Sequence, residues 1–137
     1  MKKTVGITFS AFDLLHAGHV MMLKDAKRQC DFLIVGLQVD PSIERPQKNK
    51  PIQSVVERYI QLEGCEYVDK IIPYVMESDL EDILLSYEID VRIIGEEYQF
   101  DSFTGRKICK ENDIELYYNK RKHRFSSSDL RKIIKES

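Results

Sequence analysis

The sequence predicts an α/β fold, in which one domain holds a five-stranded parallel sheet with helices on both faces. Short β-rich runs alternate with helical patterns, an order typical of parallel strands joined by right-handed crossovers. Residues 31–38 (DFLIVGLQ) are almost all apolar, as expected of a strand covered on both faces. The 137 residues suffice for one core and are too few for two, so residues 1–137 are expected to form a single domain.

The first half of the chain contains two expected strands and two expected helices. Residues 4–9 (TVGITF) form a compact apolar run with β-branched members and predict the first strand; the run described above supplies the second. Residues 20–29 place apolar side chains at helical spacing with charges between them, which predicts an amphipathic helix. Residues 54–63 are expected to form the next helix, because Ser54 can cap it and Glu57 completes a capping box.

The middle of the chain repeats this order. Residues 68–74 (VDKIIPY) predict a third strand, which is expected to stop at Pro73 because proline has no backbone N–H to donate. Residues 78–87 (SDLEDILLSY) predict a third helix, with Ser78 as its N-cap and Glu81 as the partner in a capping box.

The last third of the chain contains the remaining expected elements. Strands are expected at residues 90–95 (DVRIIG) and 114–118, and helices at residues 102–112 and 126–135. Ligands of parallel sheets bind beyond the carboxyl ends of the strands. The residues that follow the first, fourth and fifth strands are therefore the candidates for chemistry.

One long irregular segment interrupts the alternation. Residues 40–51 (DPSIERPQKNKP) hold three prolines and several charges, so the segment is too polar for a core and is expected to be a surface loop. A loop of this length is often a functional lid, and a solvated linker is the alternative; the residues leave both open.

Composition and charge exclude several classes of protein. The 21 Lys and Arg residues against 23 Asp and Glu residues give a net charge of −2, which offers no global field for nucleic acid or an anionic membrane. No apolar run approaches the roughly 20 residues of a membrane helix, and no signal peptide is recognisable. Cys30, Cys65 and Cys109 form no CxxC pair, so we expect reduced thiols and a cytoplasmic protein.

A pair of histidines follows the first expected strand. His16 and His19 are spaced i, i+3 at the start of a helix, where free backbone N–H groups and the positive end of the helix dipole favour phosphate. Gly18 would let a phosphate approach closely. No third metal ligand is adjacent, and two packing histidines are the alternative. The position of the pair at the carboxyl end of a strand favours phosphate binding.

The segment FDLLHAGH, at residues 12–19, resembles the HxGH signature of the nucleotidylyltransferase superfamily. The wider pattern is similar to small bacterial cytidylyltransferases, particularly those of the glycerol-3-phosphate type. The further matching features are Lys50 in a loop, Glu57-Arg58, the run YVDKIIP at 67–73, the strand end IIGEE at 93–97, and the run RKHRFSSS at 121–128. The resemblance covers nearly the whole chain and implies a Rossmann-like fold.

The resemblance implies transfer of CMP from CTP to a phosphorylated small molecule, with release of pyrophosphate. The implied catalytic residues are His16, His19, Lys50 and Arg121. The implied nucleotide-binding residues are Ser10, Ala11, Phe12, Asp13, Gly18, Gly95, Glu96, Ser126, Ser127 and Ser128, and Arg58 and Arg124 are implied contacts of the acceptor. Mg²⁺ is expected with the triphosphate, held mostly by phosphate oxygens and water and not by protein ligands. A homodimer is also implied.

Three departures from the family pattern concern the acceptor. Ser10-Ala11 replaces Gly-Thr, Glu66 replaces an arginine before Tyr-Val-Asp, and RFSSS replaces GISTT. An anion at Glu66 would reverse the charge near a phosphate site. The candidates for a substitute cation are Arg45, Arg92 and Arg106. The acceptor stays open among phosphorylated polyols, sugars and amino alcohols.

Two other functions stay open beside cytidylyl transfer. The superfamily also uses ATP, so an adenylyltransferase is one alternative, and a nucleotide-binding module without turnover is another. The basic run NKRKHR at residues 119–124 could form a nucleic-acid patch, but one short run in an acidic chain is a weak signal, and no nucleic-acid partner is expected.

Overall fold

A computed structural model describes residues 2–120, in which five strands form one sheet. The strands are β1 (Val5–Ser10), β2 (Phe32–Gln38), β3 (Lys70–Tyr74), β4 (Val91–Gly95) and β5 (Glu115–Asn119). Their order in the sheet is β3-β2-β1-β4-β5, and every neighbouring pair is parallel. The predicted five-stranded parallel sheet is confirmed, and the crossover between β1 and β4 gives it the Rossmann-like topology.

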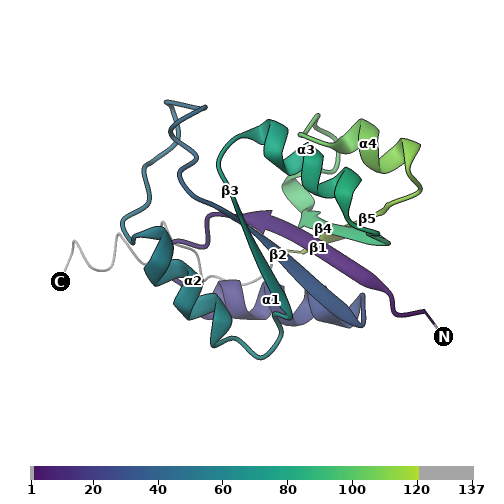
Figure 1. The fold of residues 1–137 in the computed structure, drawn as a ribbon, viewed down its shortest axis with the longest axis horizontal. Helices are drawn as coiled ribbons and strands as arrows, with labels where there is room; N and C mark the ends of the chain where they lie inside the picture. The colour runs from purple at the N-terminus through teal and green to yellow at the C-terminus, as the bar shows by residue number, and fades with distance from the viewer. Residues whose placement is uncertain (1, 121–137) are drawn as a thin grey trace.

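Helices cover both faces of this sheet, as predicted. They are α1 (Ala17–Arg28), α2 (Val55–Glu63), α3 (Glu77–Ser86) and α4 (Arg106–Glu111), with a 3-10 turn η1 (Glu96–Tyr98) after β4. Helices α1 and α2 lie on one side of the sheet and α3 and α4 on the other (Figure 1). The helix expected at residues 126–135 lies outside the described residues.

Two hydrophobic clusters sit on the two faces of the sheet. One joins β1 and β2 to α3 through Ile7, Ile34, Leu80 and Leu84. The other joins the sheet to α1 and α2 through side chains that include Leu23, Leu33 and Leu62. Strand β2 is buried from Leu33 to Gln38, because both clusters cover it. This double cover is the reason for the continuous apolar run in the sequence.

Helix α1 begins three residues earlier than the apolar spacing predicted. His16 has extended backbone dihedrals and caps the helix, and its ring accepts a hydrogen bond from the backbone N–H of Gly18. The apolar pattern could not show this, because the first turn is fixed by a polar cap and not by a buried side chain. For α2 the predicted capping box of Ser54 and Glu57 is confirmed, with both hydrogen bonds in place.

The predicted cap of α3 is wrong. Ser78 lies inside the helix, which begins at Glu77 after Met76. Asp79, and not Glu81, reaches back, and its carboxylate accepts hydrogen bonds from the backbone N–H groups of Met76 and Val75. A shorter acidic side chain at the third helical position satisfies the same free N–H groups that a capping box satisfies.

Strand β3 ends at Tyr74, as predicted, one residue after Pro73. The proline lies inside the strand, opposite Leu37 of β2. Because β3 is at the edge of the sheet, one side of its backbone has no neighbouring strand to which an N–H would be donated. The strand also begins at Lys70, two residues later than predicted.

Helix α4 is shorter than the predicted helix at residues 102–112. Gly105 has a φ of 84° in the left-handed region, and the helix starts only after it. The three cysteines are free thiols, as predicted, with Cys109 buried and the other two half-buried. Within residues 2–120, no helix is both long enough and apolar enough to cross a bilayer.

Candidate active site

The carboxyl ends of the five strands form the edge at which the predicted site residues were expected. In the strand register Ser10 lies opposite Leu37, and Gly95 lies opposite Asn119. Each pair is at or next to the carboxyl end of its strands. The segment from Ala11 to His16 continues from β1 at this same edge and leads into α1.

The turn between β1 and α1 has an unusual backbone. Phe12 and Leu14 have φ values of 51° and 52°, a region that residues other than glycine adopt rarely. Phe12 is buried, and its ring meets the ring of His19 edge-on at a centroid distance of 5.7 Å. The buried ring and the two left-handed residues fold the turn so that the histidine pair stands at the start of α1.

The two histidines form a stacked pair. Their ring centroids are 4.0 Å apart, and the ring planes differ by 25°. His16 Nδ1 accepts from the backbone N–H of Gly18 at 3.0 Å, and His19 Nδ1 accepts from the backbone N–H of His16 at 3.3 Å. A nitrogen that accepts a hydrogen bond carries no proton, so each neutral ring carries its proton on Nε2. Both rings can therefore donate a hydrogen bond from Nε2 to an anion.

Arg58 of α2 fixes the turn and the neighbouring strand ends. Its side chain is 2% exposed. The guanidinium donates to the carbonyl oxygens of Gln53 (3.2 Å), Ala11 (2.9 Å), Gln38 (2.6 Å) and Val39 (2.5 Å). Burial lowers the pKa of Arg58, and the negative charge of Asp13 opposes that effect. The structure thus gives Arg58 a positioning role in place of the acceptor contact that the resemblance implied.

Asp13 connects the turn to the long loop between β2 and α2. Its carboxylate accepts hydrogen bonds from the backbone N–H groups of Ile52 (2.9 Å) and Gln53 (3.0 Å). In return, the backbone N–H of Leu14 donates to Gln53 Oε1 at 2.8 Å. Gln53 was not singled out from the sequence, because nothing in a lone glutamine before a helix marks it as a partner of a turn 39 residues away.

The loop between β2 and α2 carries Lys50. Residues 40–51 contain no helix or strand and project away from the sheet, as predicted (Figure 1). Lys50 is exposed, and the contacts of Asp13 hold the chain two residues after it beside the β1–α1 turn. At the start of the loop, hydrogen bonds from Ser42 lower the pKa of Asp40, and the positive charges of Lys50 and Arg58 lower it further. The fold therefore brings Lys50 to the edge where the histidines stand.

Gly95 and Glu96 follow β4 at the same edge. A side chain at Gly95 would meet the carboxylate end of Glu97, which folds back over this position and would have to move aside. Glu96 opens the 3-10 turn η1, which was not predicted. Arg121, Arg124 and Ser126 to Ser128 lie outside the described residues.

Glu66 does not lie at this site. It precedes β3 and is therefore at the amino edge of the sheet, opposite the carboxyl edge. The expectation that this carboxylate reverses the charge beside the phosphates is therefore wrong for a site formed within one chain. The YVD run identified the strand, but it did not show at which end of the strand Glu66 lies.

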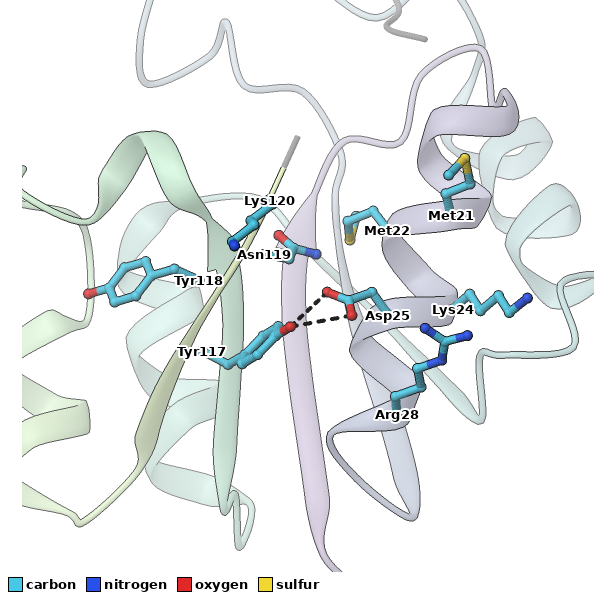
Figure 2. Close-up of a pocket in the computed structure, with 9 residues that line it drawn as sticks. All are labelled: Met21, Met22, Lys24, Asp25, Arg28, Tyr117, Tyr118, Asn119 and Lys120. Atoms are coloured by element: carbon cyan, nitrogen blue, oxygen red, sulfur yellow. Dashed lines mark hydrogen bonds between the residues drawn. The ribbon is translucent and has the colours of Figure 1, made fainter. Parts of the chain in front are cut away.

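Two cavities open near the strand ends. One, of about 380 Å³, lies at the carboxyl edge on the α3 side, and Ser10 and Ala11 line it. The other, of about 500 Å³, lies between α1 and β5 (Figure 2). In the second cavity the hydroxyl of Tyr117 donates to the carboxylate of Asp25 at 3.1 Å. Neither cavity was predictable from the sequence, because each is enclosed by segments far apart in the chain.

Comparison with known proteins gives matches over nearly the whole chain. A family model described as Cytidylyltransferase-like matches residues 7–133. Bifunctional protein HldE of Pseudomonas entomophila is 38% identical over 109 residues, which are 79% of this chain and 23% of the relative. The HldE protein of Paramagnetospirillum magneticum is 37% identical over 107 residues, which are 77% of this chain and 22% of the relative. The chain thus spans less than a quarter of the length of these relatives.

Solved structures share the fold. The lipopolysaccharide core biosynthesis protein from Thermoplasma volcanium superposes with a TM-score of 0.67 at 22% identity, over 87% of this chain and 96% of that one. A putative nicotinate-nucleotide adenylyltransferase from Vibrio parahaemolyticus gives a TM-score of 0.61 at 19% identity, over 98% and 88% of the two chains.

The matches and the site define a class of protein. A parallel sheet of this topology, with a histidine pair at the first strand end, is the arrangement of a nucleotidyltransferase-type enzyme. Within that class, the chain belongs to the cytidylyltransferase-like family.

We predict that Arg58→Met destabilises the protein by about 3–5 kcal/mol, because four carbonyl oxygens lose their shared donor and are left buried. The measurement is the free energy of unfolding in urea. Arg28→Met is the matched control, since Arg28 is exposed at the end of α1, and it should change the free energy by less than about 0.5 kcal/mol. Equal effects of the two variants would contradict the positioning role.

Proposed function

We propose that the protein transfers CMP from CTP to a phosphorylated small molecule and releases pyrophosphate. The observation that carries the proposal is the stacked pair of His16 and His19 at the start of α1, with both Nδ1 atoms occupied by backbone N–H groups. This arrangement fixes two Nε2 donors beside a helix N-terminus, where a phosphate is favoured.

In this reaction an oxygen of the acceptor phosphate attacks the α-phosphorus of the nucleotide. The bond between that phosphorus and the oxygen bridging to the β-phosphate breaks, and pyrophosphate leaves with the electron pair. No protein nucleophile is required, so the protein contributes position and charge. The Nε2–H groups of His16 and His19 would stabilise the charge that grows on the phosphate oxygens.

Lys50 is proposed to add a positive charge from the loop. A lysine on a long stem acts as a movable point charge, and the contact between Asp13 and Ile52 keeps its part of the loop beside the turn. Arg121 and the serines at 126–128 are proposed to hold the other phosphates, and Arg124 to contact the acceptor. Ser10, Ala11, Phe12, Asp13 and Gly18 would line the triphosphate site, and Gly95 and Glu96 would contact the ribose or base.

Mg²⁺ is proposed to enter with the triphosphate. Among residues 2–120, no group of three or more His, Cys, Asp or Glu side chains is placed to hold a metal ion. A Mg²⁺ ion bound mainly by phosphate oxygens and water needs no such group. The ion would neutralise charge on the leaving pyrophosphate.

The proposal names CTP as the nucleotide that donates the transferred group. CTP is supported by the description of the matching family. ATP is the second candidate, because structural neighbours include a putative nicotinate-nucleotide adenylyltransferase and a pantoate-beta-alanine ligase complexed with beta-gamma ATP and beta-alanine.

We predict that His16→Asn lowers kcat by about 10²–10³-fold while the fold is kept. Asparagine can cap α1 by accepting from the backbone N–H of Gly18, but it has no Nε2 donor. His16→Ala removes the cap as well and should also cost about 0.5–2 kcal/mol of stability. Pyrophosphate release and urea unfolding, measured on both variants, separate the two roles. A wild-type rate in His16→Asn would refute the catalytic role.

We predict that CTP supports pyrophosphate release and raises the melting temperature more than ATP does. A bound ligand at about 100 times its Kd stabilises the folded state by about 2.7 kcal/mol, so the preferred nucleotide is visible in a melting assay without turnover. The experiment crosses four nucleoside triphosphates with a panel of phosphorylated polyols, sugars and amino alcohols. A preference for ATP would make the protein an adenylyltransferase, and tight binding without product would make it a binding module.

A homodimer is proposed as the assembly state. Val56 and Ile60 are 63% and 60% exposed on one face of α2, and Ile52 before the helix is 64% exposed. We predict that Ile60→Glu converts a dimer to a monomer in sedimentation equilibrium. Leu85→Glu is the matched control, because Leu85 is 59% exposed on α3, and it should leave the dimer intact. A monomeric wild-type protein would refute the assembly.

A further inference from the structure

The cavity of about 380 Å³ at the carboxyl edge has an unusual lining. It is lined by residues of α3, of the carboxyl ends of β1, β2 and β3, and of the middle of β4. Its charged lining residues are Arg45, Lys48, Arg92 and Glu77. Three cations against one anion give this small space a net positive charge, although the whole chain carries −2.

Arg92 is the buried cation of the cavity. It is 5% exposed, and its guanidinium lies between the rings of Phe9 and Phe103, at 5.0 Å from each centroid. One Nη donates to the carbonyl oxygen of Thr104, while Nε has no hydrogen-bond partner. Burial lowers the pKa of Arg92, and the side chain of Cys109 and the negative charge of Glu77 oppose that effect. Among the ion pairs of residues 2–120, none involves Arg92. A buried charge is costly unless it is paired, and within the described residues no carboxylate lies within ion-pair distance of this guanidinium.

Two further donors in the same lining are unused. Gln38 is 4% exposed and Arg45 is half-buried, and the side-chain atoms Nε2 of Gln38 and Nε of Arg45 are buried without a partner. Arg45 also pairs with Glu77 at 3.0 Å, which fixes its guanidinium at the cavity. Buried polar groups are nearly always hydrogen-bonded, so three unused donors around one cavity indicate a missing acceptor of hydrogen bonds.

The Arg92 end of the cavity is distinct from the place where the phosphates react, although Ser10 and Ala11, which are proposed to line the triphosphate site, also line the cavity. The backbone of Arg92 pairs with Ile7 of β1, three residues before β1 ends at Ser10. The guanidinium of Arg92 lies beside the ring of Phe9. His16 stands beyond the end of β1, at the start of a helix that covers the opposite face of the sheet (Figure 1). A phosphate that attacks at the histidines is therefore not the group that Arg92 holds.

We propose that this cavity binds a second acidic group of the acceptor, so that the acceptor is a phosphate ester that also carries a carboxylate or another phosphate. The phosphate at the strand edge attacks the nucleotide, and the second acid lies among Arg92, Arg45 and Gln38. The assignment to an acceptor rests on the proposed function; the binding of a second acid does not.

Unpaired donors make the cavity selective. An acceptor with a neutral tail would leave the guanidinium of Arg92 buried and unpaired, whereas an acidic tail would pair it. A site built to bind a charged or polar group rejects the analogue that lacks it far more strongly than an apolar pocket rejects a missing methylene. The expected preference for the acidic acceptor is at least about tenfold in Kd.

The test compares pairs of ligands that differ by one acid, measured by calorimetric titration without nucleotide. Glycerol 3-phosphate is compared with 3-phosphoglycerate, and ribulose 5-phosphate with ribulose 1,5-bisphosphate. The two pairs differ in length and in the kind of acid, so they distinguish a carboxylate site from a phosphate site. We expect the wild type to bind at least one acidic member at least about tenfold more tightly than its partner. Equal affinities within both pairs would overturn the proposal.

Arg92→Met is the variant that tests the residue, because methionine fits between two aromatic rings without a charge. It should abolish the preference for the acidic ligand and leave the melting temperature of the free protein unchanged or higher. Arg106→Met is the matched control: Arg106 lies 5.4 Å from the same Phe103 ring but is exposed, and its variant should keep the preference. A preference that survives in Arg92→Met would overturn the proposal.

A second variant keeps the test decisive if Arg92→Met does not fold. Arg45→Gln changes a loop residue and should reduce the preference at least about threefold, and an unreduced preference would overturn the proposal. None of these titrations requires turnover. If no triphosphate gave pyrophosphate, the proposed function would fail while the preference for the acidic ligand could still be observed.

Discussion

The buried guanidinium of Arg58 is the interaction on which the site depends. It joins carbonyl oxygens at the ends of β1 and β2 and before α2, three places where the chain leaves regular structure. Buried carbonyl groups without donors would be costly. A single planar group with five N–H donors satisfies four of them. The β1–α1 turn and the loop of Lys50 are consequently held to one another and to the sheet.

The cap of α1 serves structure and chemistry with the same atoms. His16 and His19 use Nδ1 to satisfy backbone N–H groups at the start of the helix, as serine and glutamate do at α2. A glutamate in that role has no donor to offer, and a serine has only the O–H on the same oxygen that caps the helix. An imidazole has a second nitrogen, and fixing Nδ1 as an acceptor leaves the proton on Nε2. Both rings are thereby oriented before any ligand binds, which reduces the cost of ordering them.

Several cations stand at the carboxyl edge although the chain as a whole is slightly acidic. Lys50 stands above the edge on its loop, while Arg92 and Arg45 surround a cavity beneath it. Glu66, which family resemblance placed near the phosphates, is at the opposite edge. Arg92 lies on the face of the sheet covered by α3, whereas the histidines open a helix on the opposite face (Figure 1). This separation is the basis for distinguishing a reacting phosphate from a second acid in the acceptor.

Local sequence determined the alternation of strands and helices, the burial of β2, the capping box at α2 and the placement of the histidine pair after β1. Each of these features depends on side chains that are a few residues apart in the sequence, so the spacing of residue types is enough to predict it. The start of α1, the cap of α3 and the passage of β3 through Pro73 depended on polar caps and on which strand is at the edge. The roles of Arg58 and Arg92 required the tertiary structure. Arg58 reaches Ala11, 47 residues away, and Arg92 lies against Phe9, which is farther away still in the sequence. Only the folded chain shows that Arg58 finds four backbone acceptors there while Arg92 finds one.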